Sequence, residues 1–390
     1  MSVQSIRKNF CVLIYLISCV LNRRKPKKEL LEGVNLDHIR NMARDHSLFS
    51  LLSAALESVG LASNEDIEKK NLAIRKIMLL DAERAAILSE LESRGISHMA
   101  LKGVVLKELY PSIGLRQMAD NDILFDSNAR GEMKQIMVAR GYEVYAYNHS
   151  NHDVYLKEPV YNFEMHVSLF SPSESYNFES YFANAFEVSR KNAGSSYGYS
   201  MTDEYFYLYL KAHEYKHWVH SGTGLRSLVD TYVYLKAKQD SMDRKYLDFE
   251  LKRLNILSYE KMTRDLALKI FDHDFAESNI DGAMLSEDEV KELDNFLFYG
   301  TYGTFAKQVS NDLDKTVTGE KNTFGQKLRY LMKSLFPPVE FYRVYSPLAY
   351  KHRWLIPFVA IKRIFIAITC RPKENLSKLG AIIKYKQNKK

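Results

Sequence analysis

Two aspartates, Asp120 and Asp122, stand one residue apart at the start of a strand-like run, Asp120–Phe125, with the sequence DNDILF. Side chains of a β-strand alternate between its two faces. We therefore expect the two carboxylates side by side on one face, with Ile123 and Phe125 facing the core. Carboxylates held this close repel each other unless a cation lies between them. Because Mg²⁺ is commonly bound by one or two carboxylates and substrate phosphates, the pair points to phosphate chemistry. An Asp-x-Asp in a solvated turn is the alternative.

A third carboxylate, Glu164, lies in the strand-like run Asn162–Leu169, where it alternates with Phe163 and Met165. On a neighbouring strand it would complete a cluster able to hold one or two Mg²⁺ ions. Two such ions about 3.5–4 Å apart can stabilise both the attacking and the leaving oxygen of a phosphoryl displacement. His166 shares the face of Glu164 and belongs either to this site or to the edge of the sheet in a structural role.

Lys102 and Gly103 stand where a predicted strand, Ile96–Leu101, passes into a predicted helix, Val104–Tyr110. A glycine at such a junction lets the backbone approach a phosphate, and a helix N-terminus favours anions. Glycine is also common in such turns for steric reasons alone. Arg116, four residues before the first aspartate, has a planar guanidinium suited to a triphosphate. An exposed loop arginine is the alternative.

A competing motif, His213-Glu214-Tyr215-Lys216-His217, has the H-E-x-x-H pattern of zinc proteases on a segment predicted to be helical. On a helix the two histidines would share a face. The chain lacks the glycine and the third histidine of the extended pattern, and Lys216 would put a positive charge between the two ligands. Zinc hydrolysis is therefore the weaker alternative.

The elements that must position these residues fall into three predicted regions. Residues 1–94 have helical periodicity, with one helix capped by Asp37 that continues through Leu56 and another from Glu65 to Glu92. Residues 95–195 alternate short strands and helices. Residues 196–390 return to a helical pattern. We expect an α+β fold, in which a small mixed sheet is flanked by N-terminal and C-terminal helical regions. The further elements expected in the sheet region are a helix over Ala129–Arg140 and strands over Tyr142–Tyr147, Asp153–Lys157 and Tyr161–Leu169.

The composition is that of an ordinary globular protein, with 46% hydrophobic and 26% charged residues and a net charge of +7. The three cysteines, Cys11, Cys19 and Cys370, have no paired spacing, which favours a reducing compartment and a cytoplasmic protein. The apolar run Phe10–Leu21 is shorter than the roughly 20 residues of a transmembrane helix. It is either a buried first helix or the signal of a lipoprotein anchored through Cys19.

Three segments together carry a family resemblance: Ala100–Tyr110 (ALKGVVLKELY), Gly114–Phe125 (GLRQMADNDILF) and Glu164-Met165-His166. They resemble the L-K-G, R-x-M-x-D-x-D and E-x-H motifs of an uncharacterised bacterial nucleotidyltransferase family. That family belongs to the DNA polymerase beta-like nucleotidyltransferase superfamily. The likeness extends to Leu30–Leu56 and to His213–Leu235.

The resemblance implies transfer of an NMP from an NTP to an acceptor hydroxyl, with pyrophosphate leaving. Asp120 and Asp122 would bind Mg²⁺, of which two ions are expected, and Glu164 would act as a third ligand or as the base. Lys102 and Gly103 would line the triphosphate. The further nucleotide-binding candidates are Arg116, His166, His213, Lys216 and His217.

Two positions depart from the superfamily pattern. Gly103-Val104 replaces the usual Gly-Ser pair, so no serine hydroxyl can hold the γ-phosphate there, and Asn121 stands where an apolar residue is usual. The first departure keeps open a non-catalytic nucleotide-binding or interaction protein on the same fold. The acceptor stays open among a sugar, another small molecule, a protein side chain and an RNA end. The sequence has no DNA-binding signature and no transmembrane span.

Overall fold

The computed structural model describes residues 3–171, 177–220, 222–297 and 346–362, together with 332, 336 and 342. The chain divides into two compact units, one of Met1–Tyr215 and Gly224–Thr301 and one of Lys216–Thr223 and Tyr302–Lys390. The carboxylates and the sheet belong to the first unit. In the second, the structure describes the short helix α17 (Pro347–Lys351) and the 3₁₀ turn η5 (Arg353–Leu355). Much of the predicted C-terminal helical region, including Cys370, lies outside the described residues.

The N-terminal helix α1 (Val3–Leu21) packs against α2 (Leu36–Asp45), α3 (Phe49–Ser58) and α12 (His273–Ser278). Its apolar run is buried from Phe10 to Ile17, and so is Cys19. A 3₁₀ turn, η1 (Lys28–Leu31), follows. Among the described residues, no helix combines the length and the apolar character needed to cross a bilayer.

The prediction of one helix capped by Asp37 and continuing through Leu56 is wrong in two respects. The cap is Asn35, whose side-chain oxygen accepts hydrogen bonds from the backbone N–H groups of Asp37 and His38. The helix also breaks after Asp45, because Ser47 adopts a left-handed conformation with φ of +54°. Both helices bury their apolar residues, so the periodicity alone did not reveal the break.

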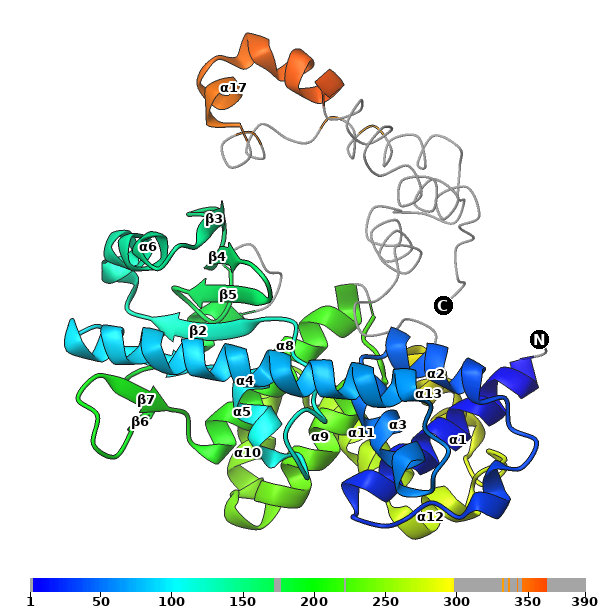
Figure 1. The fold of residues 1–390 in the computed structure, drawn as a ribbon. Helices are drawn as coiled ribbons and strands as arrows, with labels where there is room; N and C mark the ends of the chain where they lie inside the picture. Colours follow the sequence, from blue (N-terminus) through cyan, green and yellow to red (C-terminus); the bar gives the residue numbers. More distant parts are fainter. Residues whose placement is uncertain are drawn as a thin grey trace. The chain divides into compact units, whose positions relative to one another are not determined.

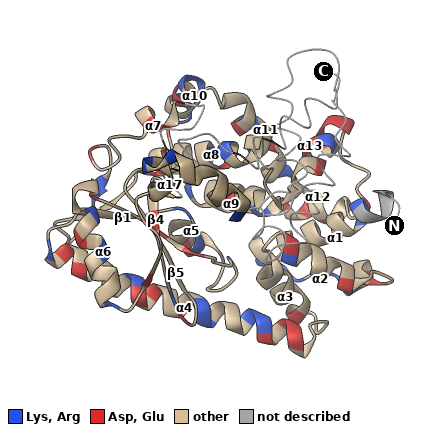
Figure 2. Cartoon of the chain, turned by 90° about the horizontal axis from the view of Figure 1, so that it is seen from above, with Lys and Arg blue, Asp and Glu red and all other residues tan. Residues whose placement is uncertain are grey.

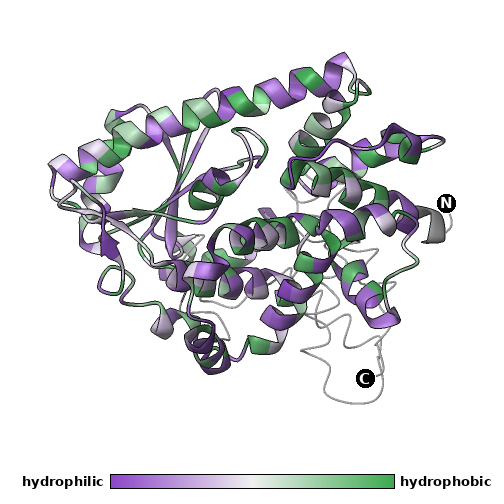
Figure 3. Ribbon diagram, turned by 90° about the horizontal axis from the view of Figure 1, so that it is seen from below, coloured by the Kyte–Doolittle hydropathy of each residue, from purple (hydrophilic) through white to green (hydrophobic). Residues whose placement is uncertain are grey.

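Helix α4 (Asn64–Ser93) has 30 residues, which makes it about 45 Å long. Ser63 and Asp66 form a reciprocal capping box at its start, and Gly95, with φ of +74°, follows its end. The helix runs from α2 and α3 along the sheet (Figure 1). Charged residues of both signs are distributed along α4 (Figure 2), and hydrophobic residues alternate with hydrophilic ones (Figure 3). The predicted helix from Glu65 to Glu92 is confirmed.

The sheet has seven strands in the order β3-β4-β5-β2-β1-β7-β6. Its pairs β2·β5 and β1·β7 are parallel and the others are antiparallel, which confirms a mixed sheet. The sequence did not predict the β6–β7 hairpin. The strands are β1 (His98–Ala100), β2 (Asn121–Phe125), β3 (Glu143–Ala146), β4 (His152–Lys157), β5 (Tyr161–His166), β6 (Arg190–Lys191) and β7 (Gly198–Ser200).

Helices cover both faces of this sheet. On one face, α4 and α6 (Arg130–Ala139) pack on a core that includes Ile123, Phe125 and Phe163. The other face contributes Met99 and Leu124 to a core with the C-terminal helices. The α+β fold with helical flanks is therefore confirmed, whereas the boundaries at 94/95 and 195/196 stay predictions. The remaining elements are α5 (Gly103–Leu106), η2 (Lys107–Leu109), η3 (Ser127–Ala129), α7 (Phe178–Tyr181), α8 (Asp203–His220), α9 (Leu225–Lys238), η4 (Gln239–Ser241), α10 (Arg244–Arg253), α11 (Leu257–Ile270) and α13 (Glu287–Leu297).

Candidate active site

Two carboxylates, Asp122 and Glu164, lie next to each other on one face of the sheet. Strands β2 and β5 are parallel neighbours, and their register pairs Asp122 with Glu164. The intervening Ile123 faces the opposite side, in the core under α4. Asp120 immediately precedes β2, close enough for its carboxylate to interact with that of Asp122. The structure thus brings the three predicted carboxylates together.

The Asp122 carboxylate is the anchor of this charge cluster. Its Oδ1 atom accepts hydrogen bonds from Lys102 Nζ at 2.7 Å and from His166 Nε2 at 2.8 Å. Burial alone would raise the pKa of Asp122, but Lys102 and His166 outweigh burial and hold that pKa well below its usual range.

The pKa values of the other two carboxylates, Asp120 and Glu164, shift in the opposite direction. Burial and repulsion by Asp122 raise the pKa of Asp120, and the same two causes raise the pKa of Glu164 to about 7. Three carboxylates therefore share a space in which only one is held firmly as an anion. A divalent cation with oxygen ligands would remove this repulsion, so the donor set fits Mg²⁺.

The turn that carries Lys102 and Gly103 has a packing role. Lys102 has a φ of +45°, and the one-turn helix α5 starts at Gly103. A Cβ atom on Gly103 would lie 2.4 Å from Nη1 of Arg116 and 2.9 Å from the sulfur of Met118. The close approach of Arg116 therefore accounts for the glycine, which is the steric alternative considered for this position.

Arg116 is buried rather than exposed. Its Nε and Nη2 atoms donate to the two carboxylate oxygens of Asp230 on α9, at 2.8 and 2.9 Å. Tyr110 also donates its hydroxyl to Asp230 at 2.7 Å. Burial would raise the pKa of Asp230, but Arg116 outweighs burial and lowers that pKa. This planar, two-pronged pair joins α9 to the loop before β2. Arg116 stays a predicted nucleotide-binding residue, but here its guanidinium binds Asp230.

Three further cations surround the start of β2 and were not among the predicted site residues. Arg226 donates to the Gln117 carbonyl at 3.4 Å, and its charge acts on Asp120. Lys76 on α4 donates to the Ala119 carbonyl at 3.3 Å and also interacts with Asp120. Arg84 on α4 donates to the buried Asn121 side chain at 2.9 Å, which accounts for a polar residue between the aspartates. Only Arg226 had a signal in the sequence, because it lies in the family-like segment.

His152 on β4 is a further residue that the sequence reasoning missed. It stands directly opposite His166 on β5, with the two ring centroids 4.9 Å apart. Its Nε2 atom lies 3.7 Å from Oε2 of Glu164, and Nε2 of His166 lies 3.7 Å from the same oxygen. The predicted strand began at Asp153, one residue too late to include it.

The H-E-x-x-H motif lies on α8. Glu214 is buried and accepts a hydrogen bond from the fully buried Lys211 at 2.8 Å. This ion pair gives Glu214 a structural partner and weighs against its use as the base of a zinc hydrolase. His213 packs near the ring of Tyr209, with centroids 6.1 Å apart. Lys216 and His217 lie near the C-terminal end of α8 and belong to the second compact unit, so their roles stay predictions.

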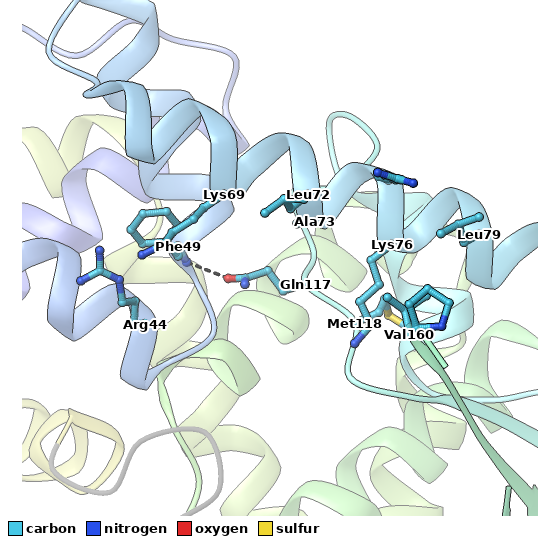
Figure 4. Close-up of a pocket in the computed structure, with 12 residues that line it drawn as sticks. Arg44, Phe49, Lys69, Leu72, Ala73, Lys76, Leu79, Gln117, Met118 and Val160 are labelled. Carbon is cyan, nitrogen blue, oxygen red and sulfur yellow. Dashed lines mark hydrogen bonds between the residues drawn. The ribbon is translucent and has the colours of Figure 1, made fainter. Parts of the chain in front are cut away.

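A cavity of about 630 Å³ lies alongside α4. Figure 4 shows Arg44 and Lys69 near Phe49 at one end of this cavity. Lys76 lies near Met118, toward the other end (Figure 4). Four cations line the cavity, Arg44, Lys69, Arg75 and Lys76, and its lining residues include no acidic side chain.

Carboxylates on adjacent strands of a mixed sheet, next to a Lys-Gly turn and between two helical layers, define a nucleotidyltransferase-type domain. The sequence comparison agrees, because residues 32–272, well over half of the chain, match a family described as uncharacterised nucleotidyltransferase. The chain belongs to this family. No curated protein and no solved structure matches the chain.

Proposed function

We propose that the protein is a Mg²⁺-dependent nucleotidyltransferase that moves an NMP from an NTP to an acceptor hydroxyl. The observation that carries the proposal is the in-register pair Asp122–Glu164, with Asp120 close enough to repel both. The family supports nucleotidyl transfer in general. We extend this to Mg²⁺ and an NTP because the carboxylates suit a hard cation that also binds phosphates.

In this proposal, Asp120, Asp122 and Glu164 hold Mg²⁺, with two ions expected. Bound Mg²⁺ would neutralise the charge that develops on the phosphate oxygens. Lys102, now bonded to Asp122, would bind the triphosphate once a cation takes over the carboxylate. The acceptor oxygen attacks the α-phosphorus, the bond to the oxygen between the α- and β-phosphates breaks, and pyrophosphate leaves. Where Glu164 is the base and not a metal ligand, it accepts the proton of the acceptor hydroxyl.

The cavity beside α4 supports an acceptor that carries an anionic group. Neither Arg75 nor Lys76 forms an ion pair with any residue that the structure describes, and both line the cavity. Phe49 and Leu72 add apolar surface for the body of such a molecule. The charge of Lys76 interacts with that of Asp120, which supports a link between this end of the cavity and the first aspartate. We expect the reaction to take place in the cytoplasm.

The test is transfer of label from α-labelled NTPs, in the presence of Mg²⁺, to candidate acceptors. Asp122→Asn keeps the shape of the side chain but removes the charge, so we expect transfer to fall by at least about 100-fold. Asp126→Asn is a matched control, because Asp126 lies just beyond the other end of β2 and bonds to the Asn128 backbone. Label transfer by Asp122→Asn at the wild-type rate would refute the proposal.

A second candidate is a nucleotide-binding protein without turnover. The observation in its favour is Val104, which is buried in the core at the position where the superfamily usually has serine. This candidate predicts that the wild-type protein binds NTPs but transfers no label to any acceptor, to itself or to water. Asp122→Asn would then change NTP affinity only.

A further inference from the structure

Three side chains, His152, Glu164 and His166, converge on one face of the sheet. The antiparallel register of β4 and β5 places His152 directly opposite His166, and Glu164 lies two residues before His166 on the same face. One ligand atom from each residue lies within 4.8 Å of the other two. We infer that these residues bind a divalent first-row transition-metal ion, zinc above all, in preference to Mg²⁺.

The donor atoms argue for this choice of metal. Two imidazole nitrogens and one carboxylate oxygen suit Zn²⁺, Fe²⁺ and related ions, whereas Mg²⁺ prefers oxygen ligands only. Ligands about 2.0–2.2 Å from a tetrahedral zinc ion lie roughly 3.4 Å from one another. The Glu164 oxygen already lies 3.7 Å from Nε2 of each histidine. These two distances are close to those of a zinc site, and the histidine nitrogens lie within 4.8 Å of each other, so the site closes once they reach the same separation.

The surroundings of the cluster also suit an ion. The side chain of His166 is only 3% exposed, whereas those of His152 and Glu164 are 29% and 22% exposed. The cluster is thus fixed on its inner side and open to solvent on the outer side, where water or a ligand can complete the coordination. Nε2 of His166 donates to Asp122 at 2.8 Å, so zinc would replace this hydrogen bond and would lie beside the Asp122 carboxylate.

This inference does not depend on nucleotidyl transfer, although Glu164 belongs to both sites. Asp120 is outside the cluster, so a zinc site and the proposed Mg²⁺ site differ by at least this residue and by His152. Binding of the metal can be measured without any nucleotide, and the two proposals can therefore fail separately.

The experiment uses the full chain, freed of metal with a chelator and then titrated with Zn²⁺ in excess Mg²⁺ by calorimetry. We expect one zinc ion per chain. His152→Ala should weaken zinc binding by more than the about 10–100-fold that loss of an outer-sphere partner costs. Co²⁺ should give the visible absorption bands of a site with nitrogen ligands, and these bands should be lost in His152→Ala.

Three further variants sharpen the test. His38→Ala removes an imidazole on α2, outside the cluster, and should leave zinc affinity unchanged. Asp120→Asn should retain zinc binding while label transfer is lost. The circular dichroism spectrum of His152→Gln checks that loss of zinc binding at this position does not reflect loss of the fold. The inference is overturned by equal zinc affinity in wild type and His152→Ala, or by no zinc binding in excess Mg²⁺.

Discussion

The buried ion pair between Arg116 and Asp230 offers the sharpest test of how the site is held in place. The side chains are 8% and 7% exposed, and Asp230 accepts two hydrogen bonds from Arg116 and one from Tyr110. Asp230→Ala would leave a buried guanidinium without its counter-charge, which costs about 3–5 kcal/mol. Loss of the hydrogen bond from Tyr110 adds about 1 kcal/mol. We therefore expect a loss of roughly 4–6 kcal/mol in the free energy of unfolding.

The double variant Arg116→Met/Asp230→Ala separates the charge effect from packing. Replacing a buried ion pair by apolar side chains is often neutral or even stabilising, so the double variant should be more stable than Asp230→Ala alone. The expected coupling energy is about 2 kcal/mol or more, well above the about 0.5 kcal/mol within which independent substitutions add. Chemical denaturation of all four proteins, followed by circular dichroism, gives this coupling directly.

Additive free energies in this cycle would refute the reasoning, because they would mean that the two side chains do not depend on each other. The same double variant also tests the predicted role of Arg116 in nucleotide binding. If Arg116 binds the triphosphate, the double variant regains stability but its Kd for the NTP stays raised. If the residue acts only through Asp230, NTP affinity recovers together with stability.

Two further predictions concern Gly103 and His46. Gly103→Ala should lower the free energy of unfolding by about 1–3 kcal/mol, measured by denaturation, because its Cβ would lie 2.4 Å from Nη1 of the firmly held Arg116. The matched control is Gly131→Ala on α6, where a Cβ meets nothing within 4 Å and alanine should stabilise the protein. Burial lowers the pKa of His46 to about 4, so the unfolded chain binds the proton more tightly between that pH and 6.5. The free energy of unfolding is therefore highest above pH 6.5 and decreases as the pH falls toward 4. The decrease is roughly 2 kcal/mol between pH 7 and pH 5. His46→Gln should lose less stability over this interval, and an equal loss would contradict the argument.

The sequence predicted those parts of the site that local patterns encode. The alternation in Asp120–Phe125 and in Tyr161–Leu169 depends only on the strand period, and it placed Asp122 and Glu164 on the face away from α4. The helical periodicity from Glu65 to Glu92 predicted α4 in the same way. These features need no knowledge of which strand pairs with which.

Contacts between residues that lie far apart in the sequence could not be predicted from such local patterns. Asp230 lies 114 positions from Arg116, and no local pattern announces that the two side chains meet. His152 is brought to His166 by the register of β4 on β5, which follows from turn geometry and packing rather than from either strand alone. Arg84 likewise explains Asn121 only after α4 has been placed on β2.

The position of α4 determines how small a working fragment of this protein can be. Ile77, Leu80 and Ile87 of α4 cover the sheet face that holds Ile123, Phe125 and Phe163. A fragment that starts at residue 95 would keep α6 but expose the part of this apolar face that α4 covers, and its strands would be prone to aggregate. The other face loses its cover in the same way without the C-terminal helices that pack on Met99 and Leu124. The sheet is thus an interior layer, and the smallest self-standing fragment must begin before Asn64 and extend beyond α10.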